Sequence, residues 1–158
     1  MQNGQKGDLA EIAFIYEATQ RDLLVLEPRG DNSPYDVAID NEDRIFKVQV
    51  KSTNFLDSSP KRKHPSYIAA VRHKDGEYIQ GQRRKATCYK ADMFDVLAVT
   101  VTPCKAWYLV PVKDAISTTV IHLYPGLKRP DKPTRNPGGP ARFEKYLDNW
   151  QIFEPQDI

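Results

Sequence analysis

Three polar side chains in a β-type stretch of the sequence could together hydrolyse a phosphodiester bond. Residues 35–40 and 44–53 are two β-type runs separated by a three-residue polar connection, which predicts a hairpin. Alternate side chains of a strand share a face, so Gln49 and Lys51 project to the same side. On the preceding run, Asp36 has the phase that shares this face. The sequence therefore predicts that a carboxylate, an amide and an ammonium group converge.

This set of groups suits metal-assisted hydrolysis. Mg²⁺ prefers hard oxygen ligands and is usually held by one or two carboxylates, water and a substrate phosphate. Asp36 is the first expected metal ligand, and the amide oxygen of Gln49 is a weaker one. The metal would polarise the phosphoryl oxygen and acidify a bound water, while Lys51 would orient that water or stabilise negative charge. We expect Mg²⁺ as the cofactor, with Mn²⁺ able to replace it.

A further carboxylate is expected from the first helix, which the sequence predicts over residues 7–21 with Asp8 as its cap. The residue of interest is Glu11. Its neighbours along one side of the helix are small or apolar: Gly7, Phe14, Ile15 and Ala18. A charge in an apolar surface needs a partner or a metal. Glu11 is therefore a candidate catalytic residue and a candidate third metal ligand.

Each of two glutamates in this helix could form an ion pair. Glu11 could instead form a structural salt bridge to a lysine, and Lys51 is itself a candidate partner. Glu17 has Arg21 one helical turn away, so we expect an ordinary surface ion pair there.

The order of these motifs resembles the PD-(D/E)XK nuclease superfamily, which has an acid on one strand and a (D/E)-x-K motif on the next. Pro34-Tyr35-Asp36 corresponds to the first motif, with Asp36 one residue beyond a literal Pro-Asp pair. Gln49-Val50-Lys51 corresponds to the second, with Gln49 in place of the acid. Residues 6–53 are similar to small nucleases related to group I intron-encoded homing endonucleases, in which this Gln is tolerated.

The resemblance implies a fold, a reaction and an assembly. The expected fold is α/β, with a restriction-endonuclease-like core in which a mixed β-sheet is flanked by helices and basic loops bind DNA. The expected reaction is site-specific cleavage of double-stranded DNA. Each subunit would contribute one cleavage site, so a homo-oligomer, either a dimer or a tetramer, is implied.

The remainder of the chain is expected to complete a single domain, residues 1–158. Composition and periodicity predict further strands in five runs: 23–26, 66–72, 95–101, 106–112 and 118–124. Residues 125–140 contain five prolines and three glycines, which favours a loop. Residues 143–153 are predicted to form a terminal helix.

Charge is distributed unevenly although the formal net charge is only +2. Residues 1–60 carry 6 Lys/Arg and 11 Asp/Glu, residues 61–90 carry 9 and 2, and residues 124–145 carry 6 and 2. Two basic segments beside an acidic one favour nucleic-acid binding over simple solvated loops. The expected phosphate contacts are Lys47, Lys61, Arg62, Lys63, Arg83, Arg84, Lys85, Lys128, Arg129 and Arg135.

Several other classes of protein have little support. Cys88 and Cys104 form no CxxC pair, and the three histidines have no Ser or Cys motif around them, which argues against zinc, redox and triad chemistry. No apolar run is long enough to span a membrane, and the N-terminus does not have the pattern of a signal peptide. We therefore expect a cytoplasmic, nucleoid-associated protein without a membrane partner.

Three alternative functions remain open from the sequence. A Holliday-junction or repair nuclease would use the same metal site but select DNA by shape. A non-catalytic DNA-binding module would carry Gln49 as the mark of a degraded site. An RNA-binding protein would stack bases on Tyr78, Tyr89 or Tyr124, although no RNP-type aromatic motif is visible.

Overall fold

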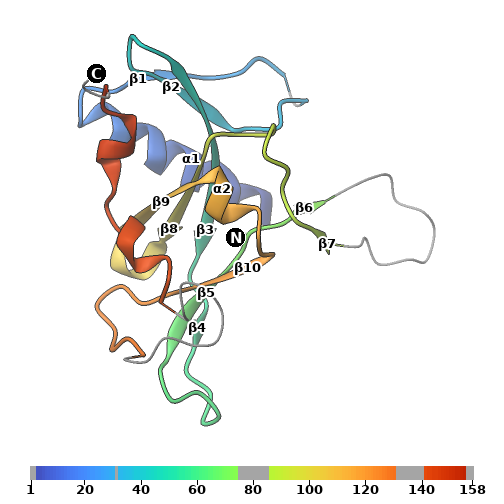
Figure 1. Cartoon of the computed structure of the whole chain (residues 1–158), viewed down its shortest axis with the longest axis vertical. Helices are drawn as coiled ribbons and strands as arrows, with labels where there is room; N and C mark the ends of the chain where they lie inside the picture. Colours follow the sequence, from blue (N-terminus) through green and yellow to red (C-terminus); the bar gives the residue numbers. More distant parts are fainter. Residues whose placement is uncertain (1–2, 31, 75–85, 131–140, 156–158) are drawn as a thin grey trace, which may run out of the picture.

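The centre of the fold is a mixed β-sheet of five strands (Figure 1). The computed structural model describes four stretches of the chain: residues 3–30, 32–74, 86–130 and 141–155. The strands of the sheet, in spatial order, are β1 (Leu24–Leu26), β2 (Val37–Asp40), β3 (Ile45–Thr53), β8 (Val96–Val101) and β9 (Ala106–Pro111). Only β3 and β8 run parallel within it. The predicted α/β class and mixed sheet are confirmed.

The two central strands differ in pattern because of what covers them. Every residue of β8 is buried, since β3 and β9 pair with its two edges and other elements cover both of its faces. A strand in this position has a nearly continuous apolar sequence. On β3 the side chains of Phe46, Val48 and Val50 are buried in one core, while Lys47 is exposed on the other face. The polar face of β3 is therefore confirmed.

Helix α1 (Asn3–Thr19) covers one face of the sheet and packs mainly on β3 and β1 (Figure 1). The ring of Phe14 anchors it, with centroids 5.6 Å from Trp107 and 5.5 Å from Trp150. The prediction that Asp8 caps this helix was wrong, because the helix begins before Gly7 and Asp8 lies inside it. Helix propagation and packing outweigh the cost of an internal glycine, about 1 kcal/mol. Within the described ranges no helix is long and apolar enough to cross a membrane.

A second, smaller sheet lies against the other face. It contains β10 (Val120–Leu123), β5 (Ser66–Ala70) and β4 (Leu56–Asp57), in that order, and α2 (Val112–Ala115) packs beside it on β8 and β9. The β-run predicted near 118–124 is thus confirmed as a strand, although it joins this sheet and not the central one. A short pair, β6 (His73–Lys74) and β7 (Ala86–Thr87), flanks the stretch 75–85, which lies outside the described residues.

The predicted terminal helix over 143–153 was wrong. Two short 3₁₀ turns occupy this region, η2 (Glu144–Tyr146) and η3 (Trp150–Phe153), and a third, η1 (Thr102–Cys104), connects β8 to β9. Between η2 and η3 the backbone is extended at Leu147, which pairs with Tyr108, and left-handed at Asp148. The amide of Asp148 donates to the carbonyl of Trp107 at 2.8 Å. Pairing with the edge of β9 interrupts the helix.

Candidate active site

The hairpin between β2 and β3 sets the register of the candidate site. Its connection is residues 41–44, one residue longer than predicted, because Asn41 organises the turn. The Asn41 side-chain oxygen accepts hydrogen bonds from the amides of Asp43 and Arg44 at 3.2 and 2.9 Å. The strands then pair with Val37 opposite Val48. The pairing continues by one residue beyond β2, so the residue that precedes β2 lies opposite Gln49 in β3.

That position is Asp36, and its carboxylate turns toward β3. Its amide donates to the carbonyl of Val48 at 3.0 Å, which extends the ladder one residue beyond β2. Its Oδ2 accepts hydrogen bonds from Gln49 Nε2 at 2.5 Å and from the amide of Val50 at 2.7 Å. The structure therefore brings Asp36 and Gln49 together. Neither bond uses Oδ1, which accepts no hydrogen bond within the described part of the chain.

Lys51 lies two residues further along β3, on the face that carries Gln49. Its side chain is half-buried, and its charge lowers the pKa of Asp36 without overcoming the effect of burial. Its Nζ is 6.0 Å from the ring centroid of Tyr89. Burial and the nearby Asp36 charge in turn raise the pKa of Tyr89. Tyr89 is thus a neighbour of the site that motif reasoning missed, because it belongs to no motif and is distant in sequence.

Glu11 approaches the same site from α1. Its carboxylate is half-buried, and its pKa is raised first by burial and then by the neighbouring charges of Asp36 and Asp8. Lys51 acts in the opposite direction and lowers it. The alternative of a direct salt bridge between Glu11 and Lys51 is not supported, since neither residue forms an ion pair in the described ranges. The charge of Asp36 therefore acts on the Glu11 carboxylate.

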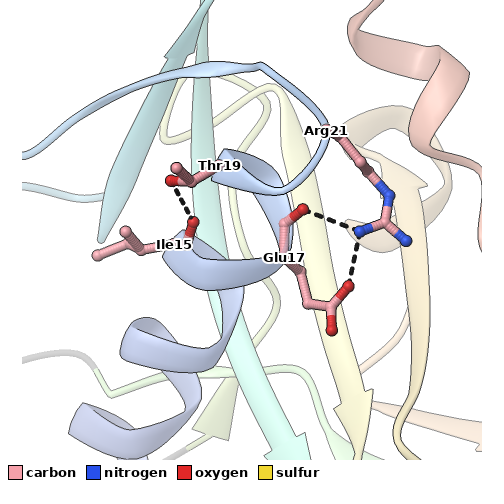
Figure 2. A network of polar contacts seen from close by, with 4 residues as sticks. All are labelled: Ile15, Glu17, Thr19 and Arg21. Atoms are coloured by element: carbon pink, nitrogen blue, oxygen red, sulfur yellow. Dashed lines mark hydrogen bonds and ion pairs between the residues drawn. The ribbon is translucent and has the colours of Figure 1, made fainter.

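Another acid of α1, Glu17, provides a contrast. Its Oε2 is 2.6 Å from Arg21 Nη1, and the same nitrogen donates to the Glu17 carbonyl at 2.8 Å (Figure 2). The neighbouring Thr19 hydroxyl donates to the carbonyl of Ile15 at 2.7 Å. The expected surface ion pair is confirmed. Arg21, just beyond the end of α1, neutralises Glu17, whereas Glu11 has no ion-pair partner among the described residues.

The donor set fits a hard divalent cation. Burial raises the pKa of Asp36, and the amide of Val50, Lys51 and Gln49 offset only part of this effect. Burial is the main cause of the raised pKa of both Asp36 and Glu11, and a bound cation would lower both. Among the residues described, no three His, Cys, Asp or Glu side chains are grouped to hold a metal. Two carboxylates and the Gln49 amide are the available oxygen donors.

The expected DNA-binding residues are spread over the surface. Lys47 is exposed on β3, with Nζ 5.9 Å from the Tyr35 ring. The exposed run Lys61, Arg62 and Lys63 lies in the loop between β4 and β5, at the opposite end of the molecule from β1 and β2 (Figure 1). Arg62 Nε is 2.5 Å from Asp57 Oδ2. This arginine is therefore paired with the last residue of β4.

The second basic segment is only partly described. Lys128 and Arg129 are exposed, and Arg129 Nη2 is 3.6 Å from Glu144 Oε2. The remaining expected contacts lie outside the described residues: Arg83, Arg84, Lys85 and Arg135. The structure thus brings Asp36 and Gln49 into contact, whereas it places the predicted binding surface only in part.

The chain is similar to known proteins in both sequence and fold. The model of the PD-(D/E)XK endonuclease family matches residues 1–137, a range that includes the whole β2–β3 hairpin. Among solved structures, the chain is similar to a bacterial homing endonuclease, I-Ssp6803I, with a TM-score of 0.71 and 29% sequence identity. The similarity covers 96% of this chain and 93% of that one. A comparison with curated protein sequences gave no match. On the extent of the family match, the chain belongs to the PD-(D/E)XK endonuclease family.

Proposed function

We propose that this protein is a divalent-metal-dependent endonuclease that cuts both strands of DNA at a specific site, as homing endonucleases do. The observation that carries the proposal is the contact between Asp36 and Gln49 beside Lys51, on the β2–β3 hairpin of a chain that belongs to an endonuclease family. The half-buried Glu11 carboxylate, which faces the same charges from α1, adds support.

Each residue of the site has a distinct role in this proposal. The Val50 amide and the Gln49 side chain fix the Asp36 carboxylate through Oδ2. Asp36, Glu11 and the amide oxygen of Gln49 would hold Mg²⁺, or Mn²⁺ in its place. The bound metal would polarise the phosphoryl oxygen and acidify a water. Lys51 would stabilise the negative charge that develops on the phosphate.

The proposed substrate is double-stranded DNA, which suits the basic surface. Lys47, Lys61, Lys63 and Lys128 are exposed, and none forms an ion pair in the described ranges. Such side chains contact phosphates and position a duplex without reading its sequence. Because each chain has one candidate site, cutting both strands requires at least two copies. We propose a homo-oligomer that acts inside the cell, where it meets the nucleoid.

A cleavage assay tests the proposal. Purified protein is incubated with a random-sequence duplex library and Mg²⁺, and the cut ends are sequenced. We expect one long recognition site, and we expect Asp36→Ala and Lys51→Ala to lose about 100-fold or more in rate while still binding DNA. Asp43→Ala, an exposed change in the same hairpin, is the matched control and should cut normally.

Other results would favour the alternatives. Preference for branched over linear DNA would indicate a junction-resolving or repair nuclease. Binding without cleavage in any divalent metal would indicate a non-catalytic DNA-binding module. Normal cleavage by both Asp36→Ala and Lys51→Ala would show that the site lies elsewhere.

A further inference from the structure

The ring of Tyr89, a residue outside the sequence motifs, lies beside Lys51 of the candidate site. Tyr89 has 5% of its surface exposed, and its ring packs edge-on against Phe94 with centroids 4.9 Å apart and an interplanar angle of 80°. The Nζ of Lys51 is 6.0 Å from the Tyr89 centroid. An ammonium at about this distance from a ring is attracted to its electron-rich face. The packing of Tyr89 holds the ring in a fixed place for this contact.

The alternative partner for the ammonium is Asp36. The charge of Lys51 acts on that carboxylate, yet the two side chains form no ion pair in the described part of the chain. In a half-buried site two opposite charges attract more strongly than in water. A closed pair would place the ammonium on the carboxylate that a cation needs. Another contact of Lys51 must therefore keep its ammonium away from the Asp36 carboxylate.

We propose that Tyr89 is a positioning residue, which holds the Lys51 ammonium against its ring and so leaves the Asp36 carboxylate open to a divalent cation. The inference rests on the proposed metal-dependent function, and it gives the ring of Tyr89, not its hydroxyl, the decisive part. Tyr89 acts through Lys51 and needs no contact with the reacting phosphate.

Metal affinity without DNA tests this role. Titration calorimetry with Mn²⁺ is expected to show binding about tenfold weaker in Tyr89→Leu, because the released ammonium closes on Asp36. Tyr89→Phe keeps the ring and should bind as wild type does. In the Lys51→Met background no ammonium remains to compete, so adding Tyr89→Leu should change the affinity little. An equal loss in both backgrounds would overturn the proposal, because Tyr89 would then act independently of Lys51.

A spectroscopic measurement tests the contact without relying on the metal or on the folding of Tyr89→Leu. The lysines are dimethylated with ¹³C, which keeps their charge, and the Lys51 signal is assigned by its loss in Lys51→Arg. We expect an upfield ring-current shift in wild type and in Tyr89→Phe. A Lys51 signal at the position of exposed lysines in wild type would overturn the proposal.

The two proposals fail in different ways. Wild type that binds no Mn²⁺ and cuts no DNA would overturn the proposed function and the role of Tyr89 with it. Wild type that binds Mn²⁺ no more tightly than Tyr89→Leu would overturn the role of Tyr89 alone.

Discussion

Two carboxylates are drawn into the interior of this protein, and they differ in what surrounds them. Glu144, in η2, has a side chain only 3% exposed. Its two oxygens accept hydrogen bonds from the Tyr108 hydroxyl, both at 3.1 Å, and Oε1 also accepts the amide of Tyr124 at 2.7 Å. Arg129 supplies a positive charge at 3.6 Å. Asp36, by contrast, accepts two hydrogen bonds on one oxygen and has no ion-pair partner among the described residues.

Under the proposed function, the difference lies in how completely the surrounding residues neutralise each carboxylate. A buried charge whose partners all come from its own chain stabilises or at least maintains the fold. A half-buried charge that has one oxygen without a hydrogen bond and a raised pKa lowers the free energy of unfolding when no metal is bound. Burial alone would have selected Glu144, which is more deeply buried. Incomplete neutralisation selects Asp36 and Glu11 instead.

The largest expected effect is on the structural side of this comparison. Glu144→Gln removes the charge that receives the Tyr108 hydroxyl and faces Arg129, so we expect the free energy of unfolding to fall by about 2 kcal/mol. Urea denaturation measures it, with the exposed Glu154→Gln as control. Cleavage by the folded variant, assayed well below its melting temperature, should match wild type. A stable Glu144→Gln variant with impaired cleavage would place Glu144 on the functional side.

A smaller effect is expected for the second carboxylate of the site. Glu11→Gln should weaken Mn²⁺ binding by about tenfold, close to 1.4 kcal/mol, because the charge that helps to hold the cation is lost. Its effect on DNA affinity should be smaller. Glu17→Gln is the matched control on the same helix, since Glu17 is paired with Arg21 and should leave metal binding unchanged. Equal effects of the two variants would mean that only the net charge of α1 matters.

Much of the fold could be predicted because the signals are local. The alternation along β3 and the apolar run of β8 each identify a strand from its own residues. The region 143–153 could not be predicted, because Leu147 and Asp148 leave the helix to pair with the distant strand β9. The same limit applies to β10, whose sequence indicates a strand but not the sheet that it joins.

The site divides in the same way. The phase of a hairpin is enough to put Asp36 beside Gln49, and helical periodicity places Glu11 in an apolar surface. Tyr89 reaches Lys51 only through the tertiary fold, so no spacing in the sequence could identify it. The partner of Arg129, the buried Glu144, was hidden for the same reason.

The smallest expected effect tests the cost of the open site directly. In metal-free buffer with EDTA at pH 7, Asp36→Asn should raise the free energy of unfolding by about 1 kcal/mol. The substitution removes a charge that burial disfavours, and an amide can still accept the hydrogen bond from the Val50 amide. Urea denaturation of Asp36→Asn and Glu144→Gln should therefore give changes of opposite sign in the free energy of unfolding.

The pH dependence has a definite sign. The folded-state pKa of Asp36 is raised above its ordinary value, so the folded protein binds more protons than the unfolded chain between the two values. Metal-free wild type is therefore destabilised by this group at neutral pH, and it recovers that stability as the pH falls through the raised pKa. The gain in free energy of unfolding from Asp36→Asn should be largest at pH 7 and should vanish as the pH falls below the ordinary pKa of an aspartate.

Saturating Mn²⁺ at pH 7 should make wild type the more stable of the two proteins, since only wild type gains stability by binding the metal. An Asp36→Asn variant that is less stable than wild type in EDTA would put Asp36 in the same structural class as Glu144.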